Sequence, residues 1–397
     1  MIPNDFVNMM NASLGEARSA KILEALTGDP VVSVRVNPFK MSLADLRRHF
    51  NESAGNPVEW APDEAFYLRN RPSFTMDPLF HTGAYYVQEA SSMYVGALFD
   101  RILGELGGVP NIRVLDLCAA PGGKTTQLLS HIPSDGHLYA NEVIGSRVPI
   151  LSENVAKWGC RNVTVTNSDA SVFGKAAGTR GGLFFDVVVV DAPCSGEGMF
   201  RKGDQALENW SLNNVNLCAS RQRRILSDVW PALQGGGYLI YSTCTFNRME
   251  DEDNVAWICS ELGAECLEMR HFYPGEDLGE GFFAALLRKN GEFSVRKELK
   301  KPSLKEKSPY RIYQSEFPEA DAALAVDFDR SGCTVIDLER EDALKFLAKE
   351  PLVFADKPLG MILLTYKGLA LGFVKNLGRR SNSLLPSPRR IRNLRQV

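Results

Sequence analysis

The chain has 397 residues, of which 44% are apolar and 23% charged, and its formal net charge is -3. This composition is typical of a globular protein with room for two or three hydrophobic cores, and it excludes a disordered or fibrous chain. The mildly acidic balance argues against a globally basic nucleic-acid binder. The sequence holds neither an apolar run of about 18 residues nor the basic-then-apolar order of a signal peptide, so we expect a cytoplasmic protein without a membrane segment.

The eight cysteines do not have the spacing of a metal site. No two of them are three positions apart, so the paired thiols of a zinc site are absent and we expect no metal. A chain of this size without a secretion signal is expected to keep its thiols reduced. The cysteines stand at positions 118, 160, 194, 218, 244, 259, 266 and 333.

The first part of the chain, residues 1–80, is predicted to form a small α+β lobe. Apolar periodicity predicts its helices, and short β-branched or aromatic runs predict its strands. The expected helices cover residues 6–26 and 42–50, and the expected strands cover residues 31–36 and 66–68. A further helix, rich in aromatic and small residues, is expected over residues 81–101.

The middle of the chain alternates strand-like runs with helical stretches, from residue 113 to about residue 289. Such alternation is typical of βαβ units. We therefore predict that residues 81–295 form an α/β, Rossmann-like domain with a doubly wound, mostly parallel sheet.

The end of the chain is predicted to be a separate module. Residues 296–309, rich in lysine with prolines and serines, read as a linker, and residues 310–397 read as a small β-rich module with glycine turns. Its strands are expected near residues 334–336, 353–354, 361–366 and 370–375.

The C-terminal module is locally basic. No acidic residue follows Asp356, whereas nine basic residues do, which creates a positive field suited to phosphates. A solvated, partly disordered tail is the alternative interpretation of the last dozen residues.

A glycine-containing loop follows the first strand of the central domain, expected over residues 112–117. Glycines let a backbone pass close beneath a bound ligand, and the helix that follows offers free N–H groups. A P-loop would need a glycine at position 118, where Cys118 stands, and a full GxGxxG is also missing, so a nucleotide triphosphatase is excluded and a nicotinamide oxidoreductase is disfavoured. The candidate cofactor-binding residues of this loop are Cys118, Ala119, Ala120, Pro121, Gly122, Gly123 and Lys124.

Three acids follow the next strands. Glu142 ends the second strand about 20 residues past the glycines, the spacing at which an acid binds ribose hydroxyls; a helix-capping acid is the alternative. Asp169 follows the third strand and is predicted to accept from the amine of adenine, with a plain Asx-turn as the competing interpretation. Asp191 ends the fourth strand.

Two cysteines also follow predicted strands. The apolar runs 185–190 and 238–241 lead into Cys194 and Cys244. Because the carboxyl ends of parallel strands meet at one edge of a sheet, we expect both thiols, the glycine loop and the acids to share one crevice. An adenosine site without a phosphate cradle, beside paired thiols, points to S-adenosylmethionine as the cofactor.

Several strings closely resemble the NOP/Sun family of RNA cytosine-carbon-5 methyltransferases over most of residues 30–290. They are DLCAAPGGKT, DAPCSGEGMF, YSTCTFNRMEDEDN and GFFAALL, with SVRVNP and GAYYVQEASSM upstream. DNA cytosine methylases use the Pro-Cys thiol as nucleophile, whereas this RNA family uses the Thr-Cys thiol. The resemblance implies that Cys244 is the nucleophile, that Cys194 assists product release, and that the glycine loop, Glu142, Asp169 and Asp191 hold the cofactor.

The chemistry of cytosine agrees with these separate roles for Cys244 and Cys194. Carbon 5 is too weak a nucleophile to accept a methyl group directly, so a thiolate first adds to carbon 6 and makes carbon 5 enamine-like. A free thiol is only slightly ionised at neutral pH, so Cys244 needs a polar or cationic neighbour, which the sequence does not identify. A base must then remove the proton from carbon 5. Asp191 could instead contact the N3 or amino edge of cytosine.

The string YKGLALGFVK, residues 366–375, resembles the C-terminal PUA-like RNA-binding part of bacterial enzymes that act on small-subunit ribosomal RNA. Those relatives usually continue with a basic stretch, whereas this chain has SNSLLP at residues 381–386. We expect a monomeric methyltransferase acting on 16S ribosomal RNA. Transfer RNA is the runner-up substrate, and a catalytically silent ribosome-assembly protein is a rival that the intact Cys194 and Cys244 argue against.

Overall fold

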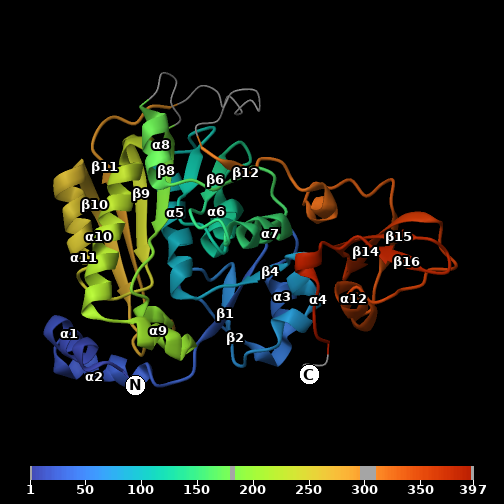
Figure 1. The fold of residues 1–397 in the computed structure, drawn as a ribbon, viewed down its shortest axis with the longest axis horizontal. Helices are drawn as coiled ribbons and strands as arrows, with labels where there is room; N and C mark the ends of the chain where they lie inside the picture. The colour runs from blue at the N-terminus through green and yellow to red at the C-terminus, as the bar shows by residue number, and fades with distance from the viewer. Residues whose placement is uncertain (1, 179–183, 296–309, 395–397) are drawn as a thin grey trace.

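The computed structural model describes residues 2–178, 184–295 and 310–394. It contains an N-terminal lobe, a central domain built on a large sheet, and a C-terminal module at one end of the molecule (Figure 1). The predicted linker, residues 296–309, lies outside the described residues. Among the described helices, none has the length and apolar character needed to cross a membrane.

The N-terminal lobe contains a four-stranded antiparallel sheet in the order β2-β3-β1-β4. The expected helix over residues 6–26 is two helices, because Gly15, with a φ of 79°, turns the chain between them. The elements of the lobe are α1 (Asn4–Leu14), α2 (Glu16–Ala25), β1 (Val32–Val36), α3 (Leu43–Phe50), β2 (Ala54–Pro57), β3 (Ala65–Leu68), α4 (Pro78–Thr82) and β4 (Tyr85–Val87).

The helix expected over residues 81–101 is wrong in its first half. Helix α4 ends at Gly83 in the left-handed conformation, and the aromatic run after it pairs with β1 as strand β4. The α-helix begins only at Tyr94, after a 3-10 turn at Ser91–Met93. Tyr85 is buried in the core of the lobe, so burial of this aromatic side chain in a sheet outweighs the local helical pattern. The lobe therefore continues past the expected boundary at residue 80.

The central sheet confirms the predicted Rossmann-like α/β class. Its eight strands have the order β10-β11-β9-β8-β5-β6-β7-β12; the five inner strands are parallel, and β10, β11 and β12 are antiparallel to their neighbours. The strands are β5 (Arg113–Asp116), β6 (His137–Asn141), β7 (Val163–Thr166), β8 (Phe185–Asp191), β9 (Leu233–Thr243), β10 (Ala264–Phe272), β11 (Phe282–Lys289) and β12 (Ile312–Gln314).

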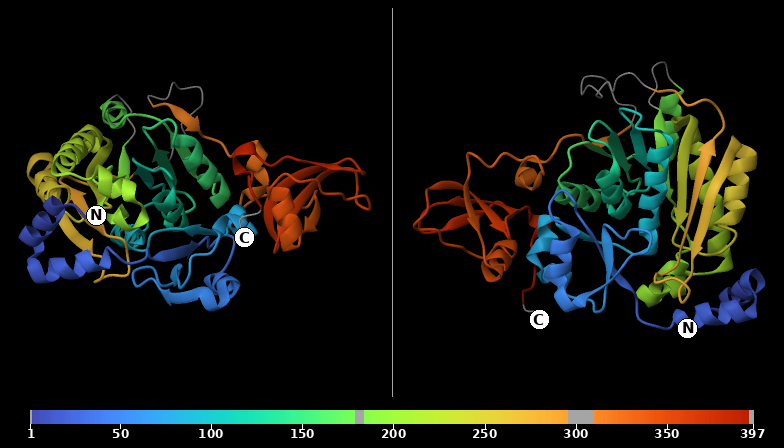
Figure 2. Two further views of the ribbon diagram at one scale, coloured as in Figure 1. Left: turned by 60° about the horizontal axis from the view of Figure 1, so that its bottom comes forward. Right: turned by 180° about the vertical axis from the view of Figure 1, so that it is seen from behind.

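Helices cover both faces of this sheet and bury a core on each side (Figures 1 and 2). One face packs against α5 (Tyr94–Glu105), α6 (Gly123–His131) and α7 (Val148–Trp158). The other packs against α8 (Ala170–Ala177), α10 (Leu212–Val229) and α11 (Glu252–Trp257). The short helix α9 (Asp204–Asn209) lies beside α1 and α2, as Figure 1 shows, where Phe6, Phe200 and Trp210 form a small aromatic core.

The C-terminal module begins later than predicted. Residues 312–314 form strand β12 on the edge of the central sheet, and Tyr310 stacks on Phe173 at a ring distance of 5.4 Å. The expected strand at residues 353–354 is not formed, and a helix that the sequence reading missed is present. The elements of the module are β13 (Thr334–Asp337), α12 (Arg340–Leu347), β14 (Gly360–Tyr366), β15 (Leu369–Asn376) and β16 (Ser381–Ser383).

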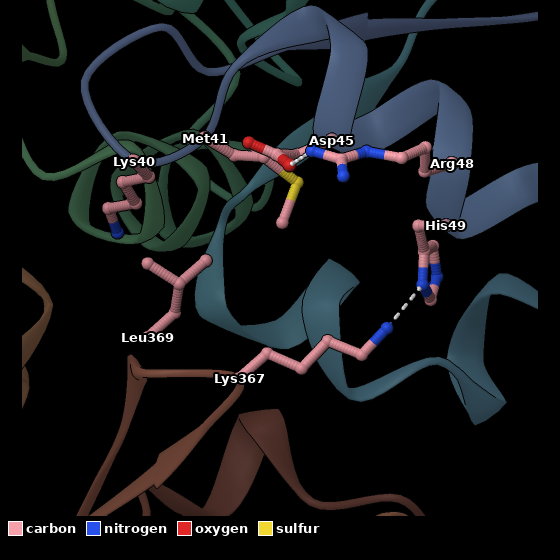
Figure 3. Close-up of a pocket in the computed structure, with 7 residues that line it drawn as sticks. All are labelled: Lys40, Met41, Asp45, Arg48, His49, Lys367 and Leu369. Atoms are coloured by element: carbon pink, nitrogen blue, oxygen red, sulfur yellow. Dashed lines mark hydrogen bonds and ion pairs between the residues drawn. The ribbon is translucent and has the colours of Figure 1, made fainter.

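The C-terminal module and the N-terminal lobe share one hydrophobic core. Arg389, counted among the basic residues of the tail, is buried: it pairs with Asp321 at 2.6 Å and donates to the carbonyl of His81 at 3.0 Å. A hollow of about 420 Å³ lies between the two parts, and Lys367 Nζ donates to His49 Nδ1 there at 3.1 Å. The residues that line it are drawn in Figure 3. The described part of the tail is therefore packed structure.

Arg35 ties the N-terminal lobe to the central domain. It is fully buried, donates to Gln88 Oε1 at 2.8 Å and to Thr126 Oγ1 at 2.7 Å, and its guanidinium lies 4.6 Å from the ring centre of Trp158.

We expect Arg35→Ala to lower the free energy of unfolding by about 2–4 kcal/mol, because it leaves a cavity and unpaired buried acceptors. Denaturant titration measures this change; Arg69→Ala, at an exposed position, is the control, and equal stability of the two variants would contradict the prediction.

Candidate functional site

The glycine loop lies between β5 and α6 and is held by hydrogen bonds with Asn141 and Arg147. Gly122, with a φ of 112°, adopts a conformation that side chains disfavour and precedes the first residue of α6. The backbone N–H of Ala119 donates to the carbonyl of Asn141 at 2.8 Å, and Arg147 Nη2 donates to the carbonyl of Ala120 at 2.5 Å. These two hydrogen bonds and the backbone conformation of Gly122 define the shape of the loop.

The side chain of Asn141 joins the ends of three strands, a role that the sequence reading missed. Its amide donates to the carbonyls of Leu117 and Ser168, both at 3.0 Å, and its oxygen accepts from Thr166 Oγ1 at 2.9 Å. Asn141 therefore fixes the ends of β5, β6 and β7 relative to one another. The sequence did contain a signal for this role: an amide side chain at the end of an apolar strand, directly before Glu142.

Glu142 is buried at the carboxyl end of β6. Its Oε1 accepts from the backbone N–H of Ile144 at 2.8 Å, while Oε2 has no hydrogen-bond partner and forms only a 3.3 Å ion pair with Arg147 Nη1. Val143 and Ile144 beside it are exposed. A buried carboxylate oxygen without a donor, flanked by exposed apolar side chains, fits a ligand that presents hydroxyls and an apolar ring.

Asp169 is exposed and caps helix α8. Its Oδ1 accepts from the backbone N–H of Ser171 at 3.0 Å, and hydrogen bonds to Ser171 lower the pKa of this carboxyl. The structure therefore shows the competing interpretation of Asp169, a side chain that binds the backbone two residues further on. An adenine contact from Asp169 stays a prediction.

Asp191 forms an ion pair with Lys124. The Nζ–Oδ2 distance is 2.8 Å, and Asp191 Oδ1 accepts from Ser242 Oγ at 2.8 Å. Burial alone would lower the pKa of Lys124, but Asp191 and, less strongly, Cys244 raise it, so the ammonium stays charged. The charged ammonium of Lys124 therefore lies at the edge of the sheet where two loops begin. We call these the thiol loops: the first follows β8 and carries Cys194, and the second follows β9 and carries Cys244.

The thiols of Cys194 and Cys244 lie together, with their Sγ atoms 3.1 Å apart. Parallel strands β8 and β9 are neighbours, and Asp191 lies opposite Ser242 in their register. The backbone N–H of Gly198 donates to the carbonyl of Cys244 at 2.8 Å. The hydrogen bond with Cys244 and burial raise the pKa of the Cys194 thiol, so Cys194 holds its proton at neutral pH.

A side chain at position 198 would disrupt this contact. A Cβ atom there would lie 2.3 Å from the carbonyl oxygen of Gly281 and 3.0 Å from that of Cys244. Glycine at 198 is required because two backbone segments meet at this point.

Asp116, at the end of β5, is an acid that the sequence reading did not select. It is fully buried, its Oδ2 accepts from Thr125 Oγ1 at 2.6 Å, and its Oδ1 has no hydrogen-bond partner. Burial raises the pKa of Asp116 to about 7. Its place at the end of the strand before the glycine loop was the available signal.

A group of possible metal ligands, Asp251, Glu252 and His271, lies behind the second thiol loop. Asp251 already accepts from the hydroxyls of Thr243 at 2.6 Å and Thr245 at 3.3 Å. The two ring nitrogens of His271 face different carboxylates, at 3.8 Å and 3.0 Å. Since a metal binds one nitrogen of a histidine ring and the carboxylates lie at opposite nitrogens, we assign no metal to this group.

Family models match three parts of the chain. The model described as 16S rRNA methyltransferase RsmB/F matches residues 105–288, the N-terminal domain of 16S rRNA methyltransferase RsmF matches residues 2–90, and the methyltransferase RsmF PUA domain matches residues 333–391. These matches agree with the three parts of the fold.

Individual relatives agree with the family models. Ribosomal RNA small subunit methyltransferase F of Escherichia fergusonii is 36% identical over 315 residues, and that of Cronobacter sakazakii is 36% identical over 317. Both alignments cover 72% of this chain and 63% of the relative. The structure of a methyltransferase homolog protein from Pyrococcus horikoshii is 30% identical with a TM-score of 0.61, covering 72% of this chain and 94% of that one. NSun6 from the same organism, 20% identical with a TM-score of 0.61, shares the fold.

The mixed Rossmann-like sheet, with its N-terminal lobe and C-terminal PUA module, defines the chain as a class I methyltransferase fold. The chain belongs to the RsmB/F family of 16S rRNA methyltransferases.

The raised pKa of Asp116 predicts a pH-dependent stability. The folded protein retains a proton on Asp116 up to a pH of about 7, whereas the unfolded chain releases it near pH 4, so stability falls as the pH rises between these values. Asp116→Asn carries no such penalty, so its free energy of unfolding should exceed that of the parent by up to about 4 kcal/mol at pH 8 and equal it near pH 4. Denaturant titrations across this range measure the difference; the exposed Glu265→Gln should leave the profile unchanged, and parallel profiles for Asp116→Asn would refute the assignment.

Proposed function

We propose that this protein methylates carbon 5 of cytosine in 16S ribosomal RNA, using S-adenosylmethionine and a covalent adduct between Cys244 and carbon 6. The observation that carries the proposal is the 3.1 Å contact between the Cys194 and Cys244 thiols, at the same sheet edge as the glycine loop. Family membership supports the reaction class, and the names of the relatives support the ribosomal substrate.

The residues at this edge fit S-adenosylmethionine. Glu142 offers a buried oxygen without a donor to ribose hydroxyls, and exposed Val143 and Ile144 offer apolar surface for adenine. When bound, the cofactor supplies an electrophilic methyl group. The residues proposed to hold it are Cys118, Ala119, Ala120, Pro121, Gly122, Gly123, Lys124, Glu142, Asp169 and Asp191.

The cation that the nucleophile needs is proposed to be Lys124. Its charged ammonium, paired with Asp191, contributes a positive field at Cys244, and the thiol of Cys194 can donate a hydrogen bond to a Cys244 thiolate. Both groups are proposed to assist the attack of the Cys244 sulfur on carbon 6. Asp191, held by Lys124 and Ser242, is available for either the cofactor or the edge of the cytosine.

Cys194 is proposed to act after the methyl group has been transferred. When the sulfur of Cys244 bonds to carbon 6, Cys194 loses the thiolate that accepts its hydrogen bond. A base must then take the proton from carbon 5, after which the electron pair of that C–H bond re-forms the ring double bond and the C–S bond breaks. Loss of that hydrogen bond removes the first cause of the raised pKa of Cys194, so its thiol releases its proton to solvent, and the thiolate beside Cys244 then serves as this base.

Two cysteine variants test the reaction. Cys244→Ala should abolish methylation and yield no covalent RNA adduct, because the nucleophile is gone. Cys194→Ala should accumulate a protein–RNA adduct on a denaturing gel, because the proton on carbon 5 is not removed. Cys160→Ala, a buried cysteine outside the site, is the control and should keep activity. Full activity of Cys244→Ala would rule out its role, and a Cys194→Ala enzyme without adduct would rule out the release step.

The choice between ribosomal and transfer RNA is tested separately. Bisulfite mapping of both RNA classes from a strain lacking the gene should show a missing methylcytosine in 16S ribosomal RNA. Loss of a transfer-RNA mark instead would favour the runner-up substrate.

The hollow of Figure 3 is proposed to contact the RNA backbone. Exposed Arg48 and Lys367 reach it from the N-terminal lobe and from the C-terminal module. Replacing either by alanine should weaken RNA binding and reduce the slope of log affinity against log salt by about one unit, without changing cofactor affinity. Lys345→Ala is the control, because Lys345 lies in the same module as Lys367 but does not line the hollow. If the slope is unchanged in both Arg48→Ala and Lys367→Ala, the hollow does not contact RNA.

A further inference from the structure

Two fully buried carboxylates lie behind the thiol loops, and the proposed reaction uses neither. Glu197 follows Cys194 in the first loop, and Glu250 follows Cys244 in the second. Burial of an acid is costly unless several donors surround it, so the partners of these two side chains indicate what they do.

The first carboxylate reaches across to the second loop. Glu197 Oε2 accepts from the backbone N–H of Phe246 at 3.0 Å, and Oε1 accepts from Asn247 Nδ2 at 2.9 Å. Trp210 Nε1 donates to Oε1 at 3.1 Å from outside both loops. Phe246 stands two residues after Cys244, so Glu197 holds the chain that carries the proposed nucleophile.

The second carboxylate reaches back in the opposite direction. Glu250 Oε2 accepts from the backbone N–H of Ser195 at 3.1 Å, and Oε1 accepts from Ser195 Oγ. Gln222 Nε2 on helix α10 donates to Oε2 at 2.7 Å. Ser195 adjoins Cys194, so each loop carries the acid that binds the other loop beside its thiol.

One amide joins the two acids. Asn247 Nδ2 donates to Glu197 Oε1 and to Glu250 Oε1, each at 2.9 Å. Every partner named for the two carboxylates is a donor, so an uncharged glutamine in either place would direct its own N–H₂ group at another donor. The arrangement requires carboxyl groups at both positions and tolerates no isosteric amide.

We propose that Glu197 and Glu250 are positioning residues whose crossed hydrogen bonds hold the Cys194 and Cys244 thiols in contact. This inference rests on the proposed function only in that both thiols act on one pyrimidine ring. Backbone bonds already join the two loops, from Ala192 to the Ser242 carbonyl and from Gly198 to the Cys244 carbonyl, and the crossed carboxylate bonds add contacts to the residues beside each thiol. A displacement of about 1 Å in a reacting group can cost about a hundredfold in rate, so these added contacts matter for the reaction.

The distance between the thiols can be tested without RNA or cofactor. Diamide accepts two electrons and two protons from a pair of thiols and leaves a disulfide, so the rate of Cys194–Cys244 disulfide formation, followed by peptide mass spectrometry, reports how often the sulfurs meet. We expect Glu197→Gln and Glu250→Gln to slow this reaction at least about tenfold. Their kcat should fall about a hundredfold, with the KM for cofactor changed less than about threefold.

The matched control is Asp186→Asn, which removes a buried carboxylate from the opposite end of β8. Asp186 accepts from the backbone N–H of Arg113 at 2.7 Å, and its loss should leave the rate of disulfide formation unchanged even where it lowers the melting temperature. If lower protein stability alone slowed disulfide formation, Asp186→Asn would show the same slowing.

If the glutamine variants do not fold, Asn247→Ser provides the same test, because it removes the shared donor without changing charge; it should also slow disulfide formation. Folded variants that oxidise at the parental rate would overturn the positioning role. That outcome is distinct from failure of the proposed reaction, which would show as methylation by Cys244→Ala with the disulfide rates still altered in the glutamine variants.

Discussion

The parallel pairing of β8 with β9 determines where this protein can do chemistry. The register that sets Asp191 opposite Ser242 sends both following loops out of the same edge of the sheet. Side chains of both strands pack alternately into the cores on the two faces of the sheet, so a shift of register would break the packing of both cores, and the pairing is strongly specified. The two thiols meet as a consequence of this pairing, although their cysteines are 50 residues apart.

The crevice is held rigid by polar side chains that are themselves buried. Asn141 joins the ends of β5, β6 and β7, and Lys124 joins the glycine loop to the end of β8. Burial makes these hydrogen bonds and ion pairs stronger than they would be in water, and equally makes an unpaired group costly. The site therefore combines several acids with one charged lysine, and its electrostatics depend on which acids keep their protons.

The N-terminal lobe links the RNA-binding module proposed at the C-terminus to the central sheet. Arg35 connects the lobe to helix α6, and the core that the lobe shares with the C-terminal module connects it to β14 and β15. The buried pair of Arg389 with Asp321 reinforces this contact. Since the module is packed and not tethered, its basic side chains have defined positions relative to the thiol crevice.

The sequence alone was enough for the α/β class, the five parallel strands and the position of each loop residue, because strand periodicity and motif spacing are local properties. It also placed Cys194, Cys244 and Glu142 at one edge, since parallel strands share their carboxyl ends. Only the tertiary structure decided that Tyr85 lies in a strand, that residues 312–314 complete the central sheet, and that Asp169 caps a helix. The Lys124–Asp191 pair and the crossed contacts of Glu197 and Glu250 were likewise beyond sequence reading. The Asp169 cap is a local contact to Ser171, which the sequence offered as one of two interpretations. The other features depend on burial and on contacts between segments far apart in the chain, which no local pattern records.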